Sequence, residues 1–359
     1  MSDPSNPFTA TVSNAPPLIA ACQALSSGQS ANFPGMGTIV GATQDGMEWQ
    51  TRLYHDTVNS VIHMMGKAAN NDSSWSHQIY NILTNTWTQE TANIVASGSS
   101  LSNPGHIYGN FAFDPTCGDI YQTKGGMDGS GADAHPKRLV WYQRSLPGWV
   151  YSPQSADISG SMASHANGLV YHPNLWGVGD GGWVLSTVNF TAFWRKANDS
   201  VIEVSTSPQS EFGNLYGDGV YWPANNCVII GAGQNVGSNT GQLALIRPNA
   251  GGTPVITALG SHPFAEIGGD TRTFANLASL HVHPNNPNKL IAIGTSVNDY
   301  QTATLSGTTL TWTDHGAHPI YSGAGYPRNI CSLGGGLNCL WAVGLNGSTP
   351  YSFLWYPPP

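Results

Sequence analysis

The chain has 359 residues, a formal net charge of −8 and only 9% charged residues. Its 12 lysine and arginine residues form no basic cluster, which argues against a nucleic-acid partner, because a phosphate backbone needs several positive contacts on one face. No apolar run reaches the roughly 18–20 residues of a membrane span. The first residues lack the basic and apolar regions of a secretory signal, so we expect no signal peptide and no membrane insertion.

The composition is that of strands and turns. Glycine (43) and proline (24) are abundant, whereas the charged residues that favour surface helices are scarce. The 12 tryptophans, 14 tyrosines and 10 phenylalanines supply ample apolar area for a core. We therefore expect one all-β domain over residues 1–359.

The first predicted elements precede any repeat. Residues 17–25 favour two helical turns, because a proline stands at their start and Gly28 follows their end. They belong to an N-terminal arm over residues 1–27. Residues 28–34 have the polar pattern of an outer strand.

A repeated pattern then follows along the chain. Apolar residues lead to Asp, His or Trp and then to proline, and an Asn- or Gly-rich turn connects to a second apolar strand. Four copies carry prolines at 115, 173, 223 and 284, and two copies without proline begin at Leu53 and Ile330. Two further strands follow each pair. This order predicts a six-bladed β-propeller of four-stranded antiparallel blades.

The predicted blades cover residues 46–105, 106–163, 164–210, 211–268, 269–322 and 323–359. The last blade reaches the end of the chain with three strands. We expect residues 28–34 to supply the fourth by pairing with the strand that contains Phe353 and Trp355. This pairing is physically favoured, because closure of the ring removes exposed strand edges.

The second strand that ends in Lys124-Gly-Gly126 and the spacing from Tyr80 to Trp87 resemble kelch and galactose-oxidase-type propeller repeats. The resemblance implies the fold over nearly the whole chain, but the oxidase's copper site is not carried over. The composition and the Asn-, Gly- and Ser-rich loops also resemble phage structural proteins, in which such propellers occur in tail or head appendages. That resemblance implies a virion protein that is assembled in the host cytoplasm.

Candidate binding residues lie where propellers gather loops around their central channel. Loops that enter the innermost strands and loops that join second to third strands supply Arg52, Trp75, His106, Tyr108, Asn110, His165, Asn167, Tyr216, Asp218, Tyr300 and Arg328. Their aromatic rings suit stacking on sugars, and their polar groups suit hydrogen bonds to hydroxyls. The alternative is that these groups only line a water-filled channel.

No cofactor or metal is expected. His281 and His283 share one strand face but have no third ligand in view, and Asp128 and Asp133 fit no EF-hand spacing. The five cysteines are expected to be reduced, with a disulfide between Cys331 and Cys339 as the alternative.

Three functions remain open. The first is a non-enzymatic phage virion protein, part of an oligomeric assembly, that binds a host-surface polysaccharide or docks other virion proteins. The second is a polysaccharide-active enzyme, either a lyase or a glycosidase. In a lyase, Arg52 or Arg328 would neutralise a carboxylate and His165 or Tyr216 would act as the base. The third is a kelch-like protein-interaction module.

Overall fold

The structure of the chain is a computed structural model. The described residues are 15–33, 35–36, 52–67, 75–90, 95–96, 99–100, 111–123, 139–142, 149–151, 168–186, 191–198, 200–204, 218–231, 242–264, 279–293, 299–320, 329–346 and 349–359.

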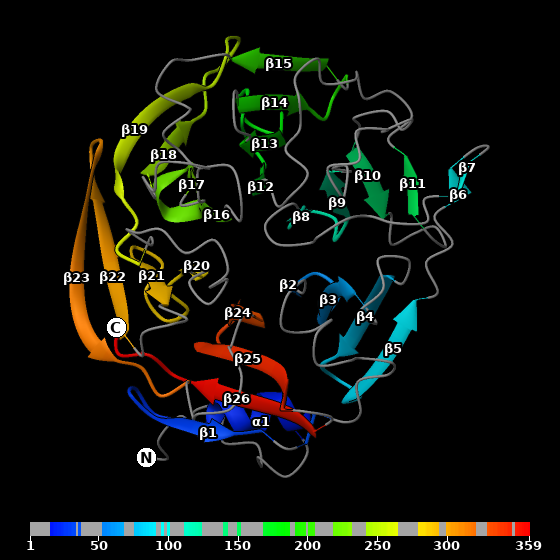
Figure 1. Cartoon of the computed structure of the whole chain (residues 1–359), viewed down its shortest axis with the longest axis vertical. Coiled ribbons are helices and arrows are strands. Elements are labelled where there is room, and N and C mark those ends of the chain that lie inside the picture. Colours follow the sequence, from blue (N-terminus) through cyan, green and yellow to red (C-terminus); the bar gives the residue numbers. More distant parts are fainter. Residues whose placement is uncertain are drawn as a thin grey trace, which may run out of the picture.

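The described strands form six four-stranded antiparallel sheets, which are arranged in a ring (Figure 1). Going along the chain, the first three sheets are β2 (Arg52–Asp56), β3 (Val61–Lys67), β4 (Trp75–Asn81) and β5 (Thr86–Glu90); β8 (Phe111–Phe113), β9 (Ile120–Thr123), β10 (Leu139–Tyr142) and β11 (Trp149–Tyr151); and β12 (Gly168–His172), β13 (Gly182–Ser186), β14 (Thr191–Arg195) and β15 (Ser200–Val204).

The next two sheets are β16 (Asp218–Trp222), β17 (Cys227–Gly231), β18 (Gln242–Arg247) and β19 (Val255–Ser261), and β20 (Ser279–Val282), β21 (Leu290–Ile293), β22 (Asp299–Ser306) and β23 (Thr309–Ala317). A short 3-10 helix, η3 (Pro223–Asn225), follows β16, and β6 (Val95–Ala96) pairs with β7 (Ser99–Ser100) outside the ring. The prediction of an all-β propeller with four-stranded antiparallel blades is confirmed.

The remaining sheet combines strands from the two ends of the chain. It has the order β1 (Ser30–Asn32), β26 (Thr349–Trp355), β25 (Cys339–Asn346) and β24 (Asn329–Leu333). Ser30 lies opposite Trp355, and Asn32 lies opposite Phe353. The predicted helix is confirmed as α1 (Pro17–Gln23), which lies beside this sheet (Figure 1).

The repeated Asp/His-Pro motif is explained by the turns that follow the inner strands. The side chain just before the turn is buried and accepts a hydrogen bond from a backbone N–H of the turn. Asp114 Oδ1 accepts from Thr116 N at 2.8 Å, and His172 Nδ1 accepts from Asn174 N at 3.0 Å. Such local bonds give a partner to backbone N–H groups of the turn that cannot form hydrogen bonds with a neighbouring strand. The proline then ends the strand, because it has no N–H to donate.

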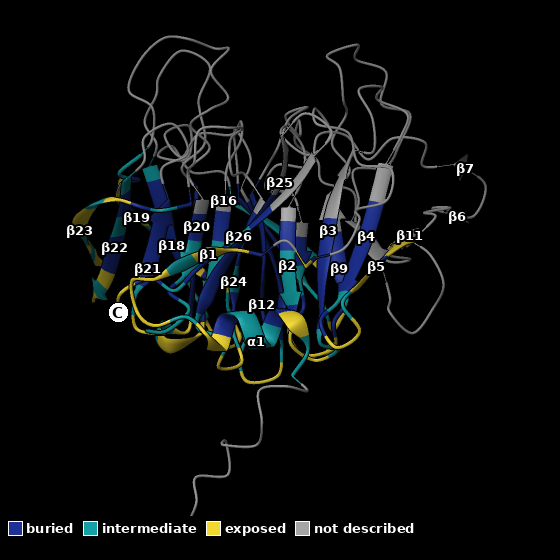
Figure 2. Cartoon of the chain, turned by 90° about the horizontal axis from the view of Figure 1, so that it is seen from below, coloured by how far each residue is buried: buried dark blue, intermediate teal, exposed yellow. Residues whose placement is uncertain are grey.

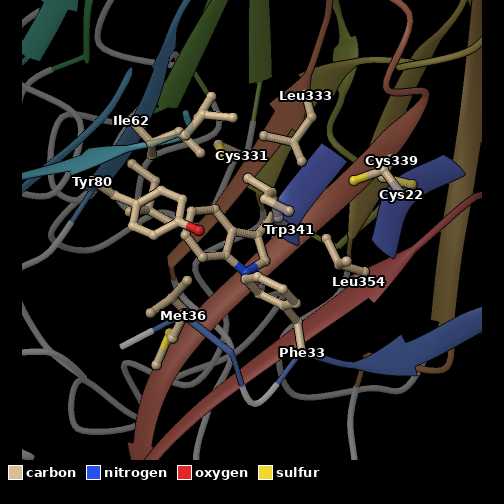
Figure 3. Packing of buried hydrophobic residues seen from close by; sticks show 14 of the residues in the cluster. Cys22, Phe33, Met36, Ile62, Tyr80, Cys331, Leu333, Cys339, Trp341 and Leu354 are labelled. Carbon is tan, nitrogen blue, oxygen red and sulfur yellow. The ribbon is translucent and has the colours of Figure 1, made fainter. Parts of the chain in front are cut away.

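The core is divided into clusters that lie between neighbouring sheets. One cluster joins α1 and the N-terminal segment to β24–β26 and to the first sheet (Figure 3). Trp341 is fully buried at its centre, where its ring lies 5.2 Å from that of Tyr80 and 6.4 Å from that of Phe33, measured between centroids. Its indole N–H donates to Ser352 Oγ at 2.5 Å. This cluster ties the two ends of the chain to the ring.

The cysteines do not form the alternative disulfide, because all five are free thiols. Cys331 lies opposite Trp341 and Cys339 lies opposite Leu333, so the two cysteines do not face each other across β24 and β25. Figure 3 shows the sulfur of Cys339 beside that of Cys22 on α1 instead.

Candidate functional site

The described residues line an open cavity of about 430 Å³ on the axis of the ring. Its lining comes from the inner strands β2, β8, β12, β16, β20 and β24, from their second or third residue onward, and from the turns that follow them, so we call it the channel mouth. Figure 2 shows α1 and the described turns at one end of the ring. The channel mouth lies at this end, because its lining includes those turns. Its volume is in the range of small-ligand sites.

Aromatic rings from neighbouring blades line much of the channel mouth. Tyr54 and Phe113 are stacked, with ring centroids 6.4 Å apart and planes inclined by 26°. Tyr171 and Tyr221 line the wall contributed by β12 and β16. The ring of Tyr221 lies 4.7 Å from that of His172, which holds it against the neighbouring blade. The site therefore offers flat apolar surfaces that carry phenolic hydroxyls.

Two histidines of the channel mouth are held in structural hydrogen bonds. Gly334 N donates to His55 Nδ1 at 3.1 Å, and His283 Nε2 donates to the Pro358 carbonyl at 2.9 Å. Burial lowers the pKa of both imidazoles to about 4. Both imidazoles are therefore neutral at pH 7. Their hydrogen bonds serve mainly to connect segments of the propeller that are distant in sequence.

Two carboxylates that adjoin lining residues in sequence, Asp114 and Asp56, are buried and already paired. Asp114 accepts a hydrogen bond from Lys196 Nζ at 2.5 Å and another from the hydroxyl of Thr116. Burial alone would raise the pKa of Asp114, but these bonds outweigh it and hold the pKa below its usual value. The ammonium of Lys196 also lies 5.7 Å from the centre of the Tyr171 ring.

A second buried carboxylate begins a chain of hydrogen bonds inside the first sheet. Asp56 accepts from the backbone and side-chain amides of Asn59, and its Oδ2 lies 3.4 Å from His63 Nε2. His63 Nδ1 lies 2.9 Å from His77 Nε2, and all three titratable side chains are fully buried. Burial would raise the pKa of Asp56, but the bonds from His63 and Asn59 lower it overall. This chain of groups stabilises the blade interior.

The pKa values predict loss of stability in mild acid. Because the folded-state pKa of His283 is about 4 and its ordinary value is 6.5, the unfolded chain binds the proton first as the pH falls. The free energy of unfolding should therefore fall between about pH 6.5 and pH 4, by on the order of 3 kcal/mol for this histidine. Asp114 and Asp56 contribute only at lower pH, because their stabilising effect is lost as the pH falls below 3.8.

Urea unfolding at several pH values measures this effect. In His283→Gln, which keeps a side-chain donor but cannot gain this proton, the slope between pH 6.5 and pH 4 should be shallower than in the wild type. An equal slope in the two proteins would contradict the assignment to His283.

The structure corrects one predicted binding residue. Tyr300 is only 6% exposed, and its ring stacks on His315 at 4.9 Å and meets the edge of Trp355 at 4.7 Å. It belongs to the core between two sheets and is not an exposed platform for a sugar. Tyr300 is the second residue of β22, and successive side chains of a strand point to opposite faces of the sheet. The side chain of Tyr300 therefore lies on the buried face.

The structure describes only some of the other predicted rim residues. Arg52, Trp75 and Asp218 stand at the first positions of β2, β4 and β16. His106, Tyr108, Asn110, His165, Asn167, Tyr216 and Arg328 lie outside the described residues. The described residues that share a cavity come instead from later positions of the inner strands and from the turns that follow them. The repeat could have identified them, because Phe113, Tyr171 and Tyr221 each stand two residues before the repeated proline.

Within the described part of the chain, no group of three His, Cys, Asp or Glu side chains could hold a metal ion. His281 and His283 both line the channel mouth, but the imidazole of His283 is already hydrogen-bonded to the Pro358 carbonyl. The described helix is too short to traverse a bilayer.

Comparison with known proteins supports the fold. No family model and no curated protein matches the sequence. A chain in the cryo-EM structure of RAG in complex with one melted and one unmelted RSS is similar, with 12% identity, coverage of 92% of this chain and 99% of that chain, and a TM-score of 0.55. An auxiliary nutrient binding protein from Bacteroides thetaiotaomicron has 10% identity, coverage of 86% and 69%, and a TM-score of 0.50. At these identities the likeness shows the β-propeller fold alone.

Proposed function

We propose that the protein is a non-enzymatic component of a phage virion that binds a host-surface glycan or docks other virion proteins. The observation that carries this proposal is the channel mouth, where the aromatic residues Tyr54, Phe113 and Tyr221 form part of the lining. Aromatic surfaces with hydroxyl groups suit sugars and partner side chains. The predicted rim residues, including Trp75 at the start of β4, supply a second binding face where the chain enters the inner strands.

Binding explains the titratable groups at this site better than catalysis does. A general base works best when its pKa is near the working pH. Burial lowers the pKa of His55 and of His283 to about 4, and each imidazole has a structural hydrogen bond. The carboxylates of Asp56 and Asp114 are fully buried and paired. These groups are arranged for stability, so the aromatic surfaces are the chemically available part of the site.

The virion setting is supported by the resemblance of the composition and loops to phage structural proteins. Several copies in one particle raise avidity by roughly 10²–10⁴ when their geometry allows simultaneous contact, so a weak single site is sufficient. The proposal includes a kelch-like, six-bladed ring that the pairing of β1 with β26 closes. Peptides of this chain should therefore be found by mass spectrometry of purified particles.

Adsorption measurements test the proposed function. Trp75→Ala should weaken adsorption of particles to host cells more than it lowers the melting temperature of the domain. Tyr300→Ala is the matched comparison, because Tyr300 is buried and its removal should lower stability instead. Blank glycan arrays together with unchanged adsorption of Trp75→Ala particles would contradict glycan binding. Release of shorter products from a polysaccharide would favour the enzyme.

A further inference from the structure

Among the described residues, the lining of the channel mouth contains no Asp, Glu, Lys or Arg. It consists of apolar, aromatic, proline, histidine, serine, threonine, cysteine and glycine residues. A ligand that carried a charge into this cavity would lose part of its hydration and would meet no carboxylate, ammonium or guanidinium of these residues. Burial of an uncompensated ion is strongly unfavourable.

Two carboxylates that adjoin lining residues in sequence, Asp114 and Asp56, are not available to a ligand. Asp114 is fully buried and bonded to Lys196, and Asp56 is fully buried and bonded to Asn59. Displacing either partner would leave a buried charge without compensation. Burial lowers the pKa of His55 and His283 to about 4, so these two imidazoles are neutral at pH 7. Burial also raises the pKa of Tyr171 and Tyr221, so these two phenols keep their protons.

What the channel mouth offers is a combination of ring faces and neutral polar groups. Tyr54 and Phe113 form a stacked pair on one side, and Tyr221 lies on the wall contributed by β16. Ser332 Oγ donates to the Val282 carbonyl at 2.9 Å, which leaves the hydroxyl oxygen able to accept a hydrogen bond. A sugar ring has a matching character, with C–H groups on its faces and hydroxyls around its edge.

We propose that the channel mouth is a binding site for an uncharged sugar unit of a glycan, with Tyr54, Phe113 and Tyr221 as its stacking surfaces. This inference rests on the proposed glycan-binding function and deepens it, because it names the charge class of the ligand. Acidic and basic sugars are disfavoured, because no described residue of the lining is Asp, Glu, Lys or Arg. The turns that follow the inner strands form part of the proposed site.

Titration calorimetry with defined saccharides tests this inference on the full chain. The probes are the neutral disaccharides lactose, maltose and cellobiose, with digalacturonic acid as the acidic probe and fully deacetylated chitobiose as the basic one. At least one neutral probe should bind about tenfold or more tightly than both charged probes, because desolvation of a charge is not repaid in this cavity. Equal or tighter binding of a charged probe would overturn the inference, as would no binding of any neutral probe.

Variants locate the site. Tyr221→Ala should weaken binding of the neutral probe about tenfold, whereas Tyr221→Phe, which keeps the ring, should weaken it only a few-fold. Leu83→Ala, at a side chain that is 58% exposed and does not line the cavity, should bind as the wild type does. If Trp75→Ala abolishes glycan binding and Tyr221→Ala leaves it unchanged, this inference is wrong and the proposed function stands. If no glycan binds and particles lack the chain, both fail.

Discussion

Deletion of residues 1–36 is expected to abolish stable folding and to cause aggregation. The segment buries Leu18, Cys22, Phe33 and Met36, each no more than 5% exposed, in the cluster around Trp341. At about 1.5–3 kcal/mol for each large apolar side chain, their loss is comparable with the whole stability of a typical domain. The deletion also removes β1 and exposes the edge of β26, where unpaired backbone groups can recruit other chains.

Sedimentation and thermal unfolding of the truncated protein measure both effects. Deletion of residues 1–14 is the control, since it leaves α1, β1 and their described contacts in place, and we expect its melting temperature to match that of the full chain. Backbone bonds from Gly28 N to the Tyr356 carbonyl and from Tyr356 N to the Gln29 carbonyl should persist in the control only. A soluble protein without residues 1–36 that melts at the unchanged temperature would refute closure by this segment.

Trp341→Ala should be the most destabilising single substitution that we predict, with a loss of about 3–5 kcal/mol. The indole is fully buried and contacts rings from three other segments, namely Phe33, Tyr80 and Trp87. Its removal leaves a cavity where β25 meets the N-terminal segment, and it also leaves Ser352 Oγ without its donor. Equilibrium unfolding in urea gives the free energy directly.

Two comparisons separate packing from hydrogen bonding. Ser352→Ala keeps the packing but leaves the buried indole N–H without its acceptor, so it should cost about 1–3 kcal/mol. Leu83→Ala on the surface should change the free energy of unfolding by less than about 0.5 kcal/mol. If Trp341→Ala is no more destabilising than Leu83→Ala, the central role of the cluster is wrong.

Much of the fold could be predicted from the sequence because the propeller repeats a local pattern. The apolar strand, the Asp/His-Pro turn and the next apolar strand are short-range features, and their recurrence predicts four-stranded units. The helix at Pro17–Gln23 was predictable for the same reason, since proline at its start and glycine beyond its end are local signals.

The details of the candidate site were less accessible, because they depend on contacts between distant residues. Lys196 reaches Asp114 across 82 positions, and His283 meets Pro358 across 75. No local pattern indicates such pairs. Tyr300 was predicted as an exposed sugar contact, but it is buried against Trp355 from the end of the chain. The aromatic lining of the channel mouth was missed because the prediction concentrated on the other ends of the inner strands.

We propose that the protein binds a glycan without converting it. The most direct test incubates the purified full chain with host-surface polysaccharide and follows binding by calorimetry and product size by chromatography in the same samples. We predict saturable binding with an unchanged polysaccharide length after prolonged incubation. Shortened chains that accumulate with time and with protein concentration would contradict the claim and identify the protein as an enzyme.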